Sequence, residues 1–272
     1  MDQNEKEQLA LELLPNAAAQ LRGALGNIKL AVSRLAPPEA RDFNGALDEN
    51  AAILYQSYYR MLRLVNNFSD AANLLEERPP VMADEDLALR LRELCDRVQP
   101  LATLKGLTLR FQCELEGHLV ACNADALERL MLNLLSNAFK FTDGGGTVTV
   151  ELKAAPGQVL LSVSDTGRGI PPDLLPTLFD RYTHTKRQDP LPHGLGLGLP
   201  LCRAIAKSHG GSLIAFSEEG KGTKVTLSLP DRTTGTDRLS DVRFDYAGGF
   251  NRTLLELSDA LPHQAYLQKH MD

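Results

Sequence analysis

The stretch that decides the fold is residues 133–142, which read Asn-Leu-Leu-Ser-Asn-Ala-Phe-Lys-Phe-Thr. Asn133 and Asn137 lie four positions apart in an apolar run, so they share one face of a predicted helix. Asparagine is a poor residue for a helix interior, and an amide can offer its oxygen to a hard cation and its NH2 group to phosphate oxygens. Lys140, one turn on, adds a positive charge for the same phosphates. The alternative is that the two amides only cap or solvate the helix.

Two glycine-containing segments follow this helix. Residues 165–170 read Asp-Thr-Gly-Arg-Gly-Ile and follow a hydrophobic strand. The Asp165 carboxylate can accept a hydrogen bond from the exocyclic amino group of adenine, and the two glycines let the backbone approach the base. Residues 194–199 read Gly-Leu-Gly-Leu-Gly-Leu and lead into a helix, whose free N–H groups favour phosphate. Each segment alone is also compatible with a simple turn.

The stretch between Phe179 and Gly194 is irregular and basic. It contains Arg181, His184, Lys186, Arg187 and His193. A basic segment of this kind next to the glycines is typical of a flap over a triphosphate. A solvated surface loop is the alternative.

Taken in order and spacing, five segments resemble the N, G1, F, G2 and G3 boxes of sensor histidine kinases. They are residues 133–142, 165–170, Phe179, 194–199 and 220–223, the last reading Gly-Lys-Gly-Thr. The ATP-binding domain of that family belongs to the superfamily shared with DNA gyrase and the ninety-kilodalton heat-shock chaperone. The resemblance covers about residues 8–230, including the helices that precede the boxes.

The resemblance implies Mg–ATP as the ligand and a mobile lid from Phe179 to Gly194. Asn137 and Lys140 would hold Mg–ATP, with Asn137 as the magnesium ligand, and Asp165 would recognise adenine. The nucleotide-binding residues that it implies are Asn133, Asn137, Lys140, Asp165, Gly167, Gly169, Ile170, Lys186, Arg187, Gly194, Leu195, Gly196, Leu197, Gly198 and Thr223.

The N-terminal region has the pattern of a helical hairpin. Apolar residues recur in alternating steps of four and three, a heptad seam of about three repeats, at Leu14, Ala18, Leu21, Leu25, Ile28, Val32 and Leu35. The pattern predicts a helix over 5–35 that ends before Pro37-Pro38, and a second helix from about 40 to 77. The short connection predicts an antiparallel pair. One hairpin cannot bury so long a seam on both helices, so we expect a homodimer that forms a four-helix bundle.

Residues 85–230 alternate between helical and strand patterns. Helices are predicted over 85–104, from Asn123 or Asp125 to about Phe139, near 172–179 and over 198–208, and strands over 107–113, 147–152, 159–164, 212–217 and 223–229. The predicted fold class is α+β: a helical hairpin followed by an α/β two-layer sandwich of the histidine kinase/gyrase type, with helices on one side of a mixed sheet.

This pattern divides the chain into a dimerisation hairpin (1–78), a linker (79–84), the ATP-binding domain (85–230) and an extension (231–272). The extension carries no motif. A strand over 242–246 and a short helix over 252–261, capped by Asn251, are expected within it. Its role stays open among docking on the ATP-binding domain, covering a sheet edge and binding a partner.

Composition excludes several classes of protein. The 272 residues carry a net charge of −6 and no basic stripe, so we expect no nucleic-acid partner. No segment approaches the roughly 20 apolar residues of a membrane span, and no signal peptide is evident, so we expect a cytoplasmic protein. Cys95, Cys113, Cys122 and Cys202 lack metal-site spacing and are expected to be reduced, mostly buried thiols.

The chain departs from the family where the phosphorylated histidine belongs. The histidine box of sensor kinases, His-Glu-Leu-Arg-Thr-Pro-Leu, aligns with residues 19–25, which read Ala-Gln-Leu-Arg-Gly-Ala-Leu. Ala19 has no nucleophile, and no histidine occurs before His118. Autophosphorylation at this position is therefore impossible. Gln20 and Gly23 replace the acidic residue and the threonine through which the same box supplies phosphatase activity in the family, so that activity is not expected either. The related ATPases place a glutamate general base where this chain has Asn133, so we expect slow ATP turnover or none.

Three interpretations of function follow from this combination. The first is a dimeric, ATP-binding histidine-kinase homologue that does not phosphorylate itself and acts as a regulatory or trans-acting partner of a kinase or response regulator. The second is an active kinase with a histidine or serine on a separate protein as its substrate. The third is a scaffold with a vestigial ATP site.

Overall fold

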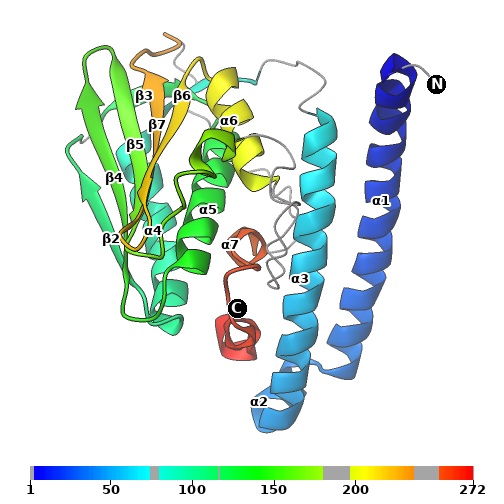
Figure 1. The fold of residues 1–272 in the computed structure, drawn as a ribbon. Helices are drawn as coiled ribbons and strands as arrows, with labels where there is room; N and C mark the ends of the chain where they lie inside the picture. Colours follow the sequence, from blue (N-terminus) through cyan, green and yellow to red (C-terminus); the bar gives the residue numbers. More distant parts are fainter. Residues whose placement is uncertain (1–2, 74–79, 116, 180–196, 236–250, 272) are drawn as a thin grey trace. The chain divides into compact units, whose positions relative to one another are not determined.

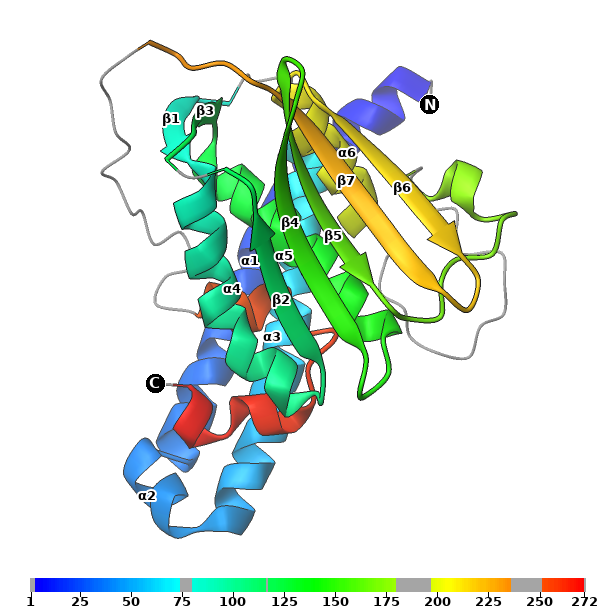
Figure 2. The same cartoon turned by 90° about the vertical axis from the view of Figure 1, so that its left-hand side faces the viewer.

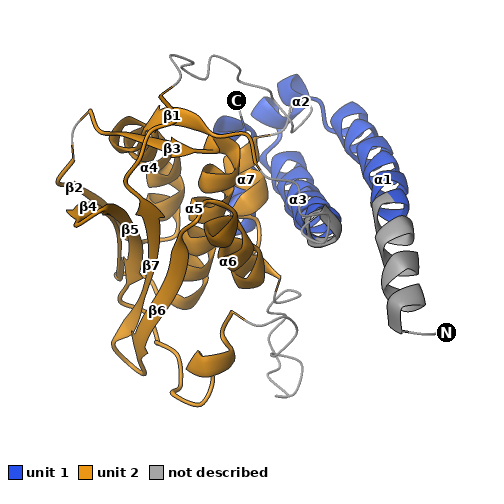
Figure 3. Cartoon of the chain, turned by 90° about the horizontal axis from the view of Figure 1, so that it is seen from above, with its two compact units in different colours: residues 1–78, 261–272 blue, residues 79–260 orange. Residues whose placement is uncertain are grey.

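The computed structural model describes residues 3–73, 80–115, 117–179, 197–235 and 251–271. The chain divides into two compact units (Figure 3). Unit 1 consists of residues 1–78 and 261–272, and unit 2 of residues 79–260.

Unit 1 is built on a helical hairpin. Its helices are α1 (Gln3–Leu35), the short α2 (Pro38–Phe43) and α3 (Gly45–Asn73), and α1 packs along α3 (Figure 1). The single helix predicted over 40–77 is wrong in one respect, because the chain leaves the helical conformation at Asn44 (φ −134°, ψ 92°). The Asn44 Oδ1 atom accepts a hydrogen bond from the Leu47 N–H at 3.1 Å, so Asn44 ends α2 and caps α3.

Of the six predicted seam side chains that the structure describes on α1, from Ala18 to Leu35, three are covered within unit 1. Ala18, Leu25 and Val32 are buried, with exposed fractions of 2%, 5% and 6%. The intervening seam residues remain open, with exposed fractions of 50% at Leu21, 44% at Ile28 and 78% at Leu35. One edge of the seam therefore faces α3, and the other is an unburied apolar edge.

Residues 261–271 complete unit 1 with two 3-10 helices, η3 (His263–Tyr266) and η4 (Gln268–His270). They pack on α2 and α3. Tyr266 is fully buried, and its ring centroid lies 5.3 Å from that of Tyr59 on α3.

Unit 2 contains a five-stranded sheet with the strand order β2-β4-β5-β7-β6 (Figure 2). The strands are β2 (Thr108–Cys113), β4 (Thr147–Ala155), β5 (Gln158–Asp165), β6 (Ser212–Glu218) and β7 (Gly222–Pro230). β2 runs parallel to β4 and the other pairs are antiparallel, so the sheet is mixed, as predicted.

Three helices cover one face of this sheet: α4 (Leu87–Leu104), α5 (Ala124–Phe141) and α6 (Gly198–Ser208) (Figures 1 and 2). Fully buried side chains of α5, among them Leu130, Leu135 and Phe139, share the core with Val150 and Leu161 of the sheet. The five predicted strands and these three helices are thus confirmed, with bounds that differ by a few residues.

Some elements of unit 2 were not predicted or are shorter than predicted. β1 (Ala83–Asp86) and β3 (Leu119–Cys122) form a separate two-stranded antiparallel sheet. The helix expected near 172–179 is only a 3-10 turn, η1 (Leu175–Thr177), and the helix expected over 252–261 is shortened to α7 (Arg252–Glu256), capped by Asn251 as expected. The strand expected over 242–246 lies outside the described residues.

Candidate nucleotide site

The helix α5 carries the first group of predicted site residues. Asn123 caps this helix, because its Oδ1 accepts a hydrogen bond from the Ala126 N–H at 2.9 Å. The Asn123 N–H in turn donates to Nε2 of the buried His209 at 3.0 Å. Asn123 and His209 together therefore hold the start of α5 against the end of α6.

The two asparagines of α5 differ in their surroundings. Asn133 is 1% exposed, and its Nδ2 donates to the Arg129 carbonyl at 3.1 Å. A Cβ atom added to Gly198, the first residue of α6, would lie 3.1 Å from the Asn133 Oδ1, so the start of α6 packs on this amide. Asn137 is half-buried, and its side chain makes no hydrogen bond to any other residue that the structure describes. Its amide is therefore open to a ligand.

Asp165 stands at the end of β5, where the chain turns. Its Oδ1 accepts hydrogen bonds from the Gly167 N–H at 2.9 Å and the Thr223 N–H at 3.3 Å. Burial raises the pKa of this carboxyl above its ordinary value, and the two backbone donors oppose the rise. Within the described ranges no hydrogen bond reaches Oδ2, which can accept from an amino group of a ligand.

The glycines around Asp165 are required by close backbone contacts. A Cβ atom on Gly167 would lie 2.3 Å from the Phe141 carbonyl oxygen, and one on Gly169 (φ 69°) would lie 2.1 Å from that of Glu218. A Cβ atom on Gly222 (φ 103°) would lie 2.0 Å from the Asp165 carbonyl oxygen. No side chain fits at these positions. The backbone of the turn after β5 therefore packs directly against the end of α5 and against the turn that joins β6 to β7.

Ser217 is a site residue that the sequence analysis missed. Its Oγ accepts from the Ile170 N–H at 2.8 Å, donates to the Gly222 carbonyl at 2.9 Å and lies 2.9 Å from the Thr223 Oγ1. Ser217 thus connects the 165–170 turn to the 220–223 turn. A serine in an alternating strand pattern carries no signal of this role.

The structure describes ten of the fifteen predicted nucleotide-binding residues. Three lie on α5 (Asn133, Asn137, Lys140), four in the turn after β5 (Asp165, Gly167, Gly169, Ile170), two at the start of α6 (Leu197, Gly198) and one on β7 (Thr223). The remaining five, Lys186, Arg187, Gly194, Leu195 and Gly196, lie outside the described residues. The contacts above bring the 165–170 turn together with Thr223 and with the end of α5. They also bring Gly198 against Asn133.

Two cations border the ring of Phe141 at the end of α5. The Arg168 guanidinium carbon lies 4.8 Å from the ring centroid and the Lys140 Nζ lies 5.7 Å from it. The Arg168 N–H also donates to the Phe141 carbonyl at 3.2 Å. Positive charge is therefore present where α5 ends beside the 165–170 turn, as a phosphate-binding site requires.

Magnesium fits this donor set only as an ion shared with the ligand. The described residues contain no group of three or more His, Cys, Asp or Glu side chains able to hold a metal. Mg²⁺ in nucleotide sites uses one or two protein oxygens together with phosphates and waters. The open amide of Asn137 meets that requirement.

The segment aligned with the histidine box lies on α1 in unit 1. Ala19 and Gln20 are exposed, next to the buried Ala18. Arg22 is tied to α3, because its guanidinium donates to the Ser69 Oγ at 3.0 Å and the Asn66 Oδ1 at 3.4 Å. Residue 19, which the sequence analysis aligns with the histidine of sensor kinases, is therefore a solvent-facing methyl group.

The described residues bear on two further expectations. None of their helices is long and apolar enough to cross a membrane. All four cysteines are free thiols, and Cys95, Cys122 and Cys202 are buried, as predicted.

Comparison with known proteins assigns the family of this site. Residues 122–233 match the family of histidine kinase-, DNA gyrase B- and HSP90-like ATPases. The chain is 34% identical over 173 residues to the sensor protein DivL of Caulobacter vibrioides, covering 62% of this chain and 22% of that protein. It is 36% identical over 190 residues to the histidine protein kinase DivJ of the same bacterium, covering 67% of this chain and 31% of that protein.

A solved structure extends the likeness to the hairpin. Full-length ShkA, determined in complex with AMPPNP, is 26% identical, with a TM-score of 0.65 over 83% of this chain and 47% of that chain. Residues 122–233 therefore form a histidine kinase-, DNA gyrase B- and HSP90-like ATPase domain. The likeness to ShkA extends beyond that domain, with the predicted order of helical hairpin and ATPase fold. The chain spans less than a third of the length of DivL or DivJ.

Proposed function

We propose that this chain binds Mg–ATP and signals without phosphorylating itself at the usual histidine position. One observation carries the proposal. The described nucleotide-binding positions hold the residue types expected of the family, and backbone contacts fix the turns between them. The aligned acceptor position, in contrast, holds an exposed alanine, Ala19. A methyl group cannot accept a phosphoryl group.

In this proposal the chain has three functional parts. Residues 1–78 dimerise, residues 85–230 bind Mg–ATP through Asn137, Lys140 and Asp165, and residues 231–272 are an extension. The open apolar edge of α1, formed by Leu21, Ile28 and Leu35, supports dimerisation, because a second hairpin can cover it as a four-helix bundle. Partners of the dimer would be a response regulator or a histidine kinase of a two-component system.

A second candidate function is phosphorylation of a histidine or serine on a separate protein. The observation that favours it is that the ten described residues of the nucleotide site keep their positions although residue 19 is alanine. A partner kinase that keeps its histidine but has an inactivated ATP site would then carry the label only after incubation with this chain and ATP. A purely structural role as a scaffold would instead show itself as absence of ATP binding.

The test combines calorimetry with radiolabelling. The purified chain is titrated with Mg–ATP, then incubated with γ-labelled ATP, and both protein-bound label and released phosphate are measured. We expect binding without label and with little release, and the Asn137→Ala variant is expected to bind more weakly. Acid-labile label on the wild-type protein would overturn the proposal, because it would place the acceptor on another histidine.

A gain-of-function variant separates loss of the acceptor from loss of catalysis. Ala19→His together with Gln20→Glu restores the first two residues of the box at exposed positions, where neither change disturbs packing. Label on this variant, and none on an Ala19→Gln control, is expected if the ATPase domain is competent. Absence of label despite ATP binding would exclude the second candidate function.

A further inference from the structure

Residues 251–271 carry no family motif, yet they are well packed in the structure. Residues 251–260 belong to unit 2 and residues 261–271 to unit 1. The chain therefore passes from one compact unit to the other a second time, at the Ala260–Leu261 peptide bond. The first passage is near residue 78.

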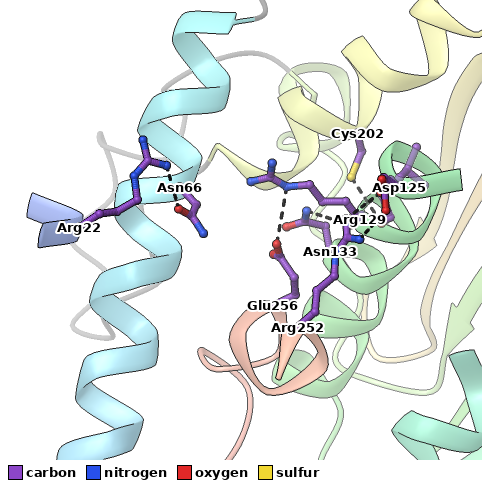
Figure 4. A network of polar contacts seen from close by, with 9 residues as sticks. Arg22, Asn66, Asp125, Arg129, Asn133, Cys202, Arg252 and Glu256 are labelled. Atoms are coloured by element: carbon purple, nitrogen blue, oxygen red, sulfur yellow. Dashed lines mark hydrogen bonds and ion pairs between the residues drawn. The ribbon is translucent and has the colours of Figure 1, made fainter. Parts of the chain in front are cut away.

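In unit 2, residues 251–260 are held on α5 by charged and apolar contacts. The Arg252 guanidinium donates to the Asp125 Oδ1 at 2.9 Å and to the Asp125 carbonyl at 2.8 Å. Glu256, only 4% exposed, forms an ion pair with Arg129 at 3.6 Å between Oε1 and Nε (Figure 4). Leu254, Leu255 and Leu257 are buried, each no more than 4% exposed.

The last residue of this portion is fixed as well. The Lys105 Nζ, at the end of α4, donates to the Ala260 carbonyl at 3.2 Å. Ala260 itself is 7% exposed. The segment is thus anchored in unit 2 up to the residue at which it leaves that unit.

In unit 1, three polar side chains of the hairpin hold the main chain of residues 261–271. Arg41 donates to the Tyr266 carbonyl at 2.8 Å, and the Asp48 carboxylate, which also pairs with Arg41 at 2.7 Å, accepts from the Gln268 N–H at 3.1 Å. Gln56 donates to the Leu261 carbonyl at 2.7 Å. The Arg41 side chain is 2% exposed. Arg41 keeps its ion pair with Asp48 if this segment undocks, but it loses the Tyr266 carbonyl as an acceptor.

Tyr266 is the apolar anchor of the same portion. It is fully buried beside Tyr59, and Leu261 and Ala265 are buried with it. A buried aromatic ring and a paired buried arginine are the features that dominate docking energies. The first anchored residue, Leu261, directly follows the last anchored residue of unit 2, so no slack chain separates the two attachments.

We propose that residues 251–271 act as a strap that joins the ATP-binding unit to the hairpin of its own chain, in addition to the linker near residue 78. While both halves are docked, the strap bounds the separation that the two units can reach. Undocking of residues 261–271 from the hairpin removes this bound and frees the ATP-binding unit to move on the linker alone. The proposal does not rest on nucleotide binding or on the absence of the histidine.

The decisive variant lengthens the strap without removing either attachment. A flexible insert of about 15 Gly/Ser residues between Ala260 and Leu261 spans roughly 20 Å on average and leaves both docking surfaces intact. Small-angle X-ray scattering of the full chain, compared at equal oligomeric state, is expected to show a larger radius of gyration and a longer maximum dimension than the wild type. Unchanged scattering would overturn the proposal.

A second variant removes the anchor in unit 1. Tyr266→Ala is expected to give the same expansion as the insert, because residues 261–271 then undock. Lys269→Ala, an exposed substitution in the same portion, serves as the matched control and is expected to scatter like the wild type. Circular dichroism establishes that each variant keeps its helices. Expansion with Lys269→Ala, or none with Tyr266→Ala, would contradict the assigned anchor.

Discussion

The glycine turns of unit 2 and the aligned histidine-box segment of unit 1 differ in how strongly the fold constrains them. Around Asp165, a single added methyl at Gly167, Gly169 or Gly222 would meet a backbone oxygen at 2.3 Å or less. On α1, a Cβ atom added to Gly23 would meet nothing within 4 Å, and Ala19 and Gln20 are exposed. Positions 19, 20 and 23 of the box segment can therefore change without cost to the fold, whereas the turns cannot.

In the proposed function, this difference explains how one chain can keep a nucleotide site and lack the acceptor. Retention of the turns reflects packing as well as ligand binding, so their presence alone is weak evidence of catalysis. Ala19, Gln20 and Gly23 of α1 are exposed, and no packing contact within the hairpin constrains them. The identity of residue 19 is thus more informative about activity than any of the glycines.

The largest expected effect is a loss of stability on substitution in the glycine turns, the more constrained of the two regions. Gly222→Ala forces a side chain into a left-handed conformation and against the Asp165 carbonyl, and we expect a loss of at least about 3 kcal/mol in the free energy of unfolding. Gly220→Ala is the control, since it shares a positive φ (79°) but has no neighbour within 4 Å. It should cost about 1–2 kcal/mol. Denaturant unfolding followed by circular dichroism measures both, and equal losses would show that the close contact is not limiting.

The next largest effect distinguishes the buried edge of the α1 seam, which stabilises the hairpin, from the open edge, which is proposed to mediate dimerisation. Leu25→Ala should lower the free energy of unfolding by about 2–4 kcal/mol at any protein concentration, because Leu25 is buried within the hairpin. Leu21→Ala should instead weaken self-association, because Leu21 is half exposed in one chain. Sedimentation across a concentration series distinguishes the two. Unaltered association of the Leu21→Ala variant would remove this edge from the dimer interface.

A smaller effect concerns adenine recognition. Asp165→Asn keeps an oxygen able to accept from the Gly167 and Thr223 N–H groups, but it removes the charge beside the free Oδ2 position. We expect ATP affinity to fall roughly tenfold to a hundredfold, with the preference for ATP over GTP abolished. Calorimetric titration with both nucleotides measures this, and Glu219→Gln, an exposed change nearby, is the control. Unchanged ATP affinity would remove Asp165 from the site.

The smallest effect is a pH dependence at the junction of α5 and α6. Burial lowers the pKa of His209 below its ordinary 6.5, and its Nε2 must stay unprotonated to accept from the Asn123 N–H. The unfolded state therefore binds more protons, so stability is complete above pH 6.5 and declines as the pH falls towards the folded pKa. Denaturation midpoints between pH 7.5 and 5 should fall less in His209→Gln than in the wild type. Parallel slopes would exclude His209, and His263→Gln is a partly exposed control.

The sequence predicts the parts of the fold that repeat a periodicity. The long apolar seams and alternating strands specified the hairpin and the five-stranded sheet. The patterns around the boxes also placed Asp165 at the end of a strand and the two asparagines on a helix, as the structure has them. β1, by contrast, reads Ala-Asp-Glu-Asp, a composition with low strand propensity that only its pairing with β3 makes extended. The break at Asn44 was hidden because helical residues flank it on both sides.

The docking of residues 261–271 was beyond sequence reasoning for a different reason. Arg41 and Gln56 bind main-chain carbonyls, and Asp48 accepts from a main-chain N–H. Backbone atoms are the same in every residue, so such contacts leave no trace in residue type. Ser217 was missed likewise, because two of its contacts are with the backbone of Ile170 and Gly222.

The division of unit 1 between two distant stretches of sequence also has a consequence for biosynthesis. Residues 261–271 emerge from the ribosome roughly 10–40 s after Asn73, at about 5–20 residues per second, so the ATP-binding unit is complete before unit 1 is. During that interval Arg41 and Tyr59 lack the peptide that will cover them. Closure of unit 1 joins residues 225 positions apart, a contact of high sequence separation that makes this step the slow one. The nascent hairpin is therefore the part of the chain most exposed to chaperones and to premature association.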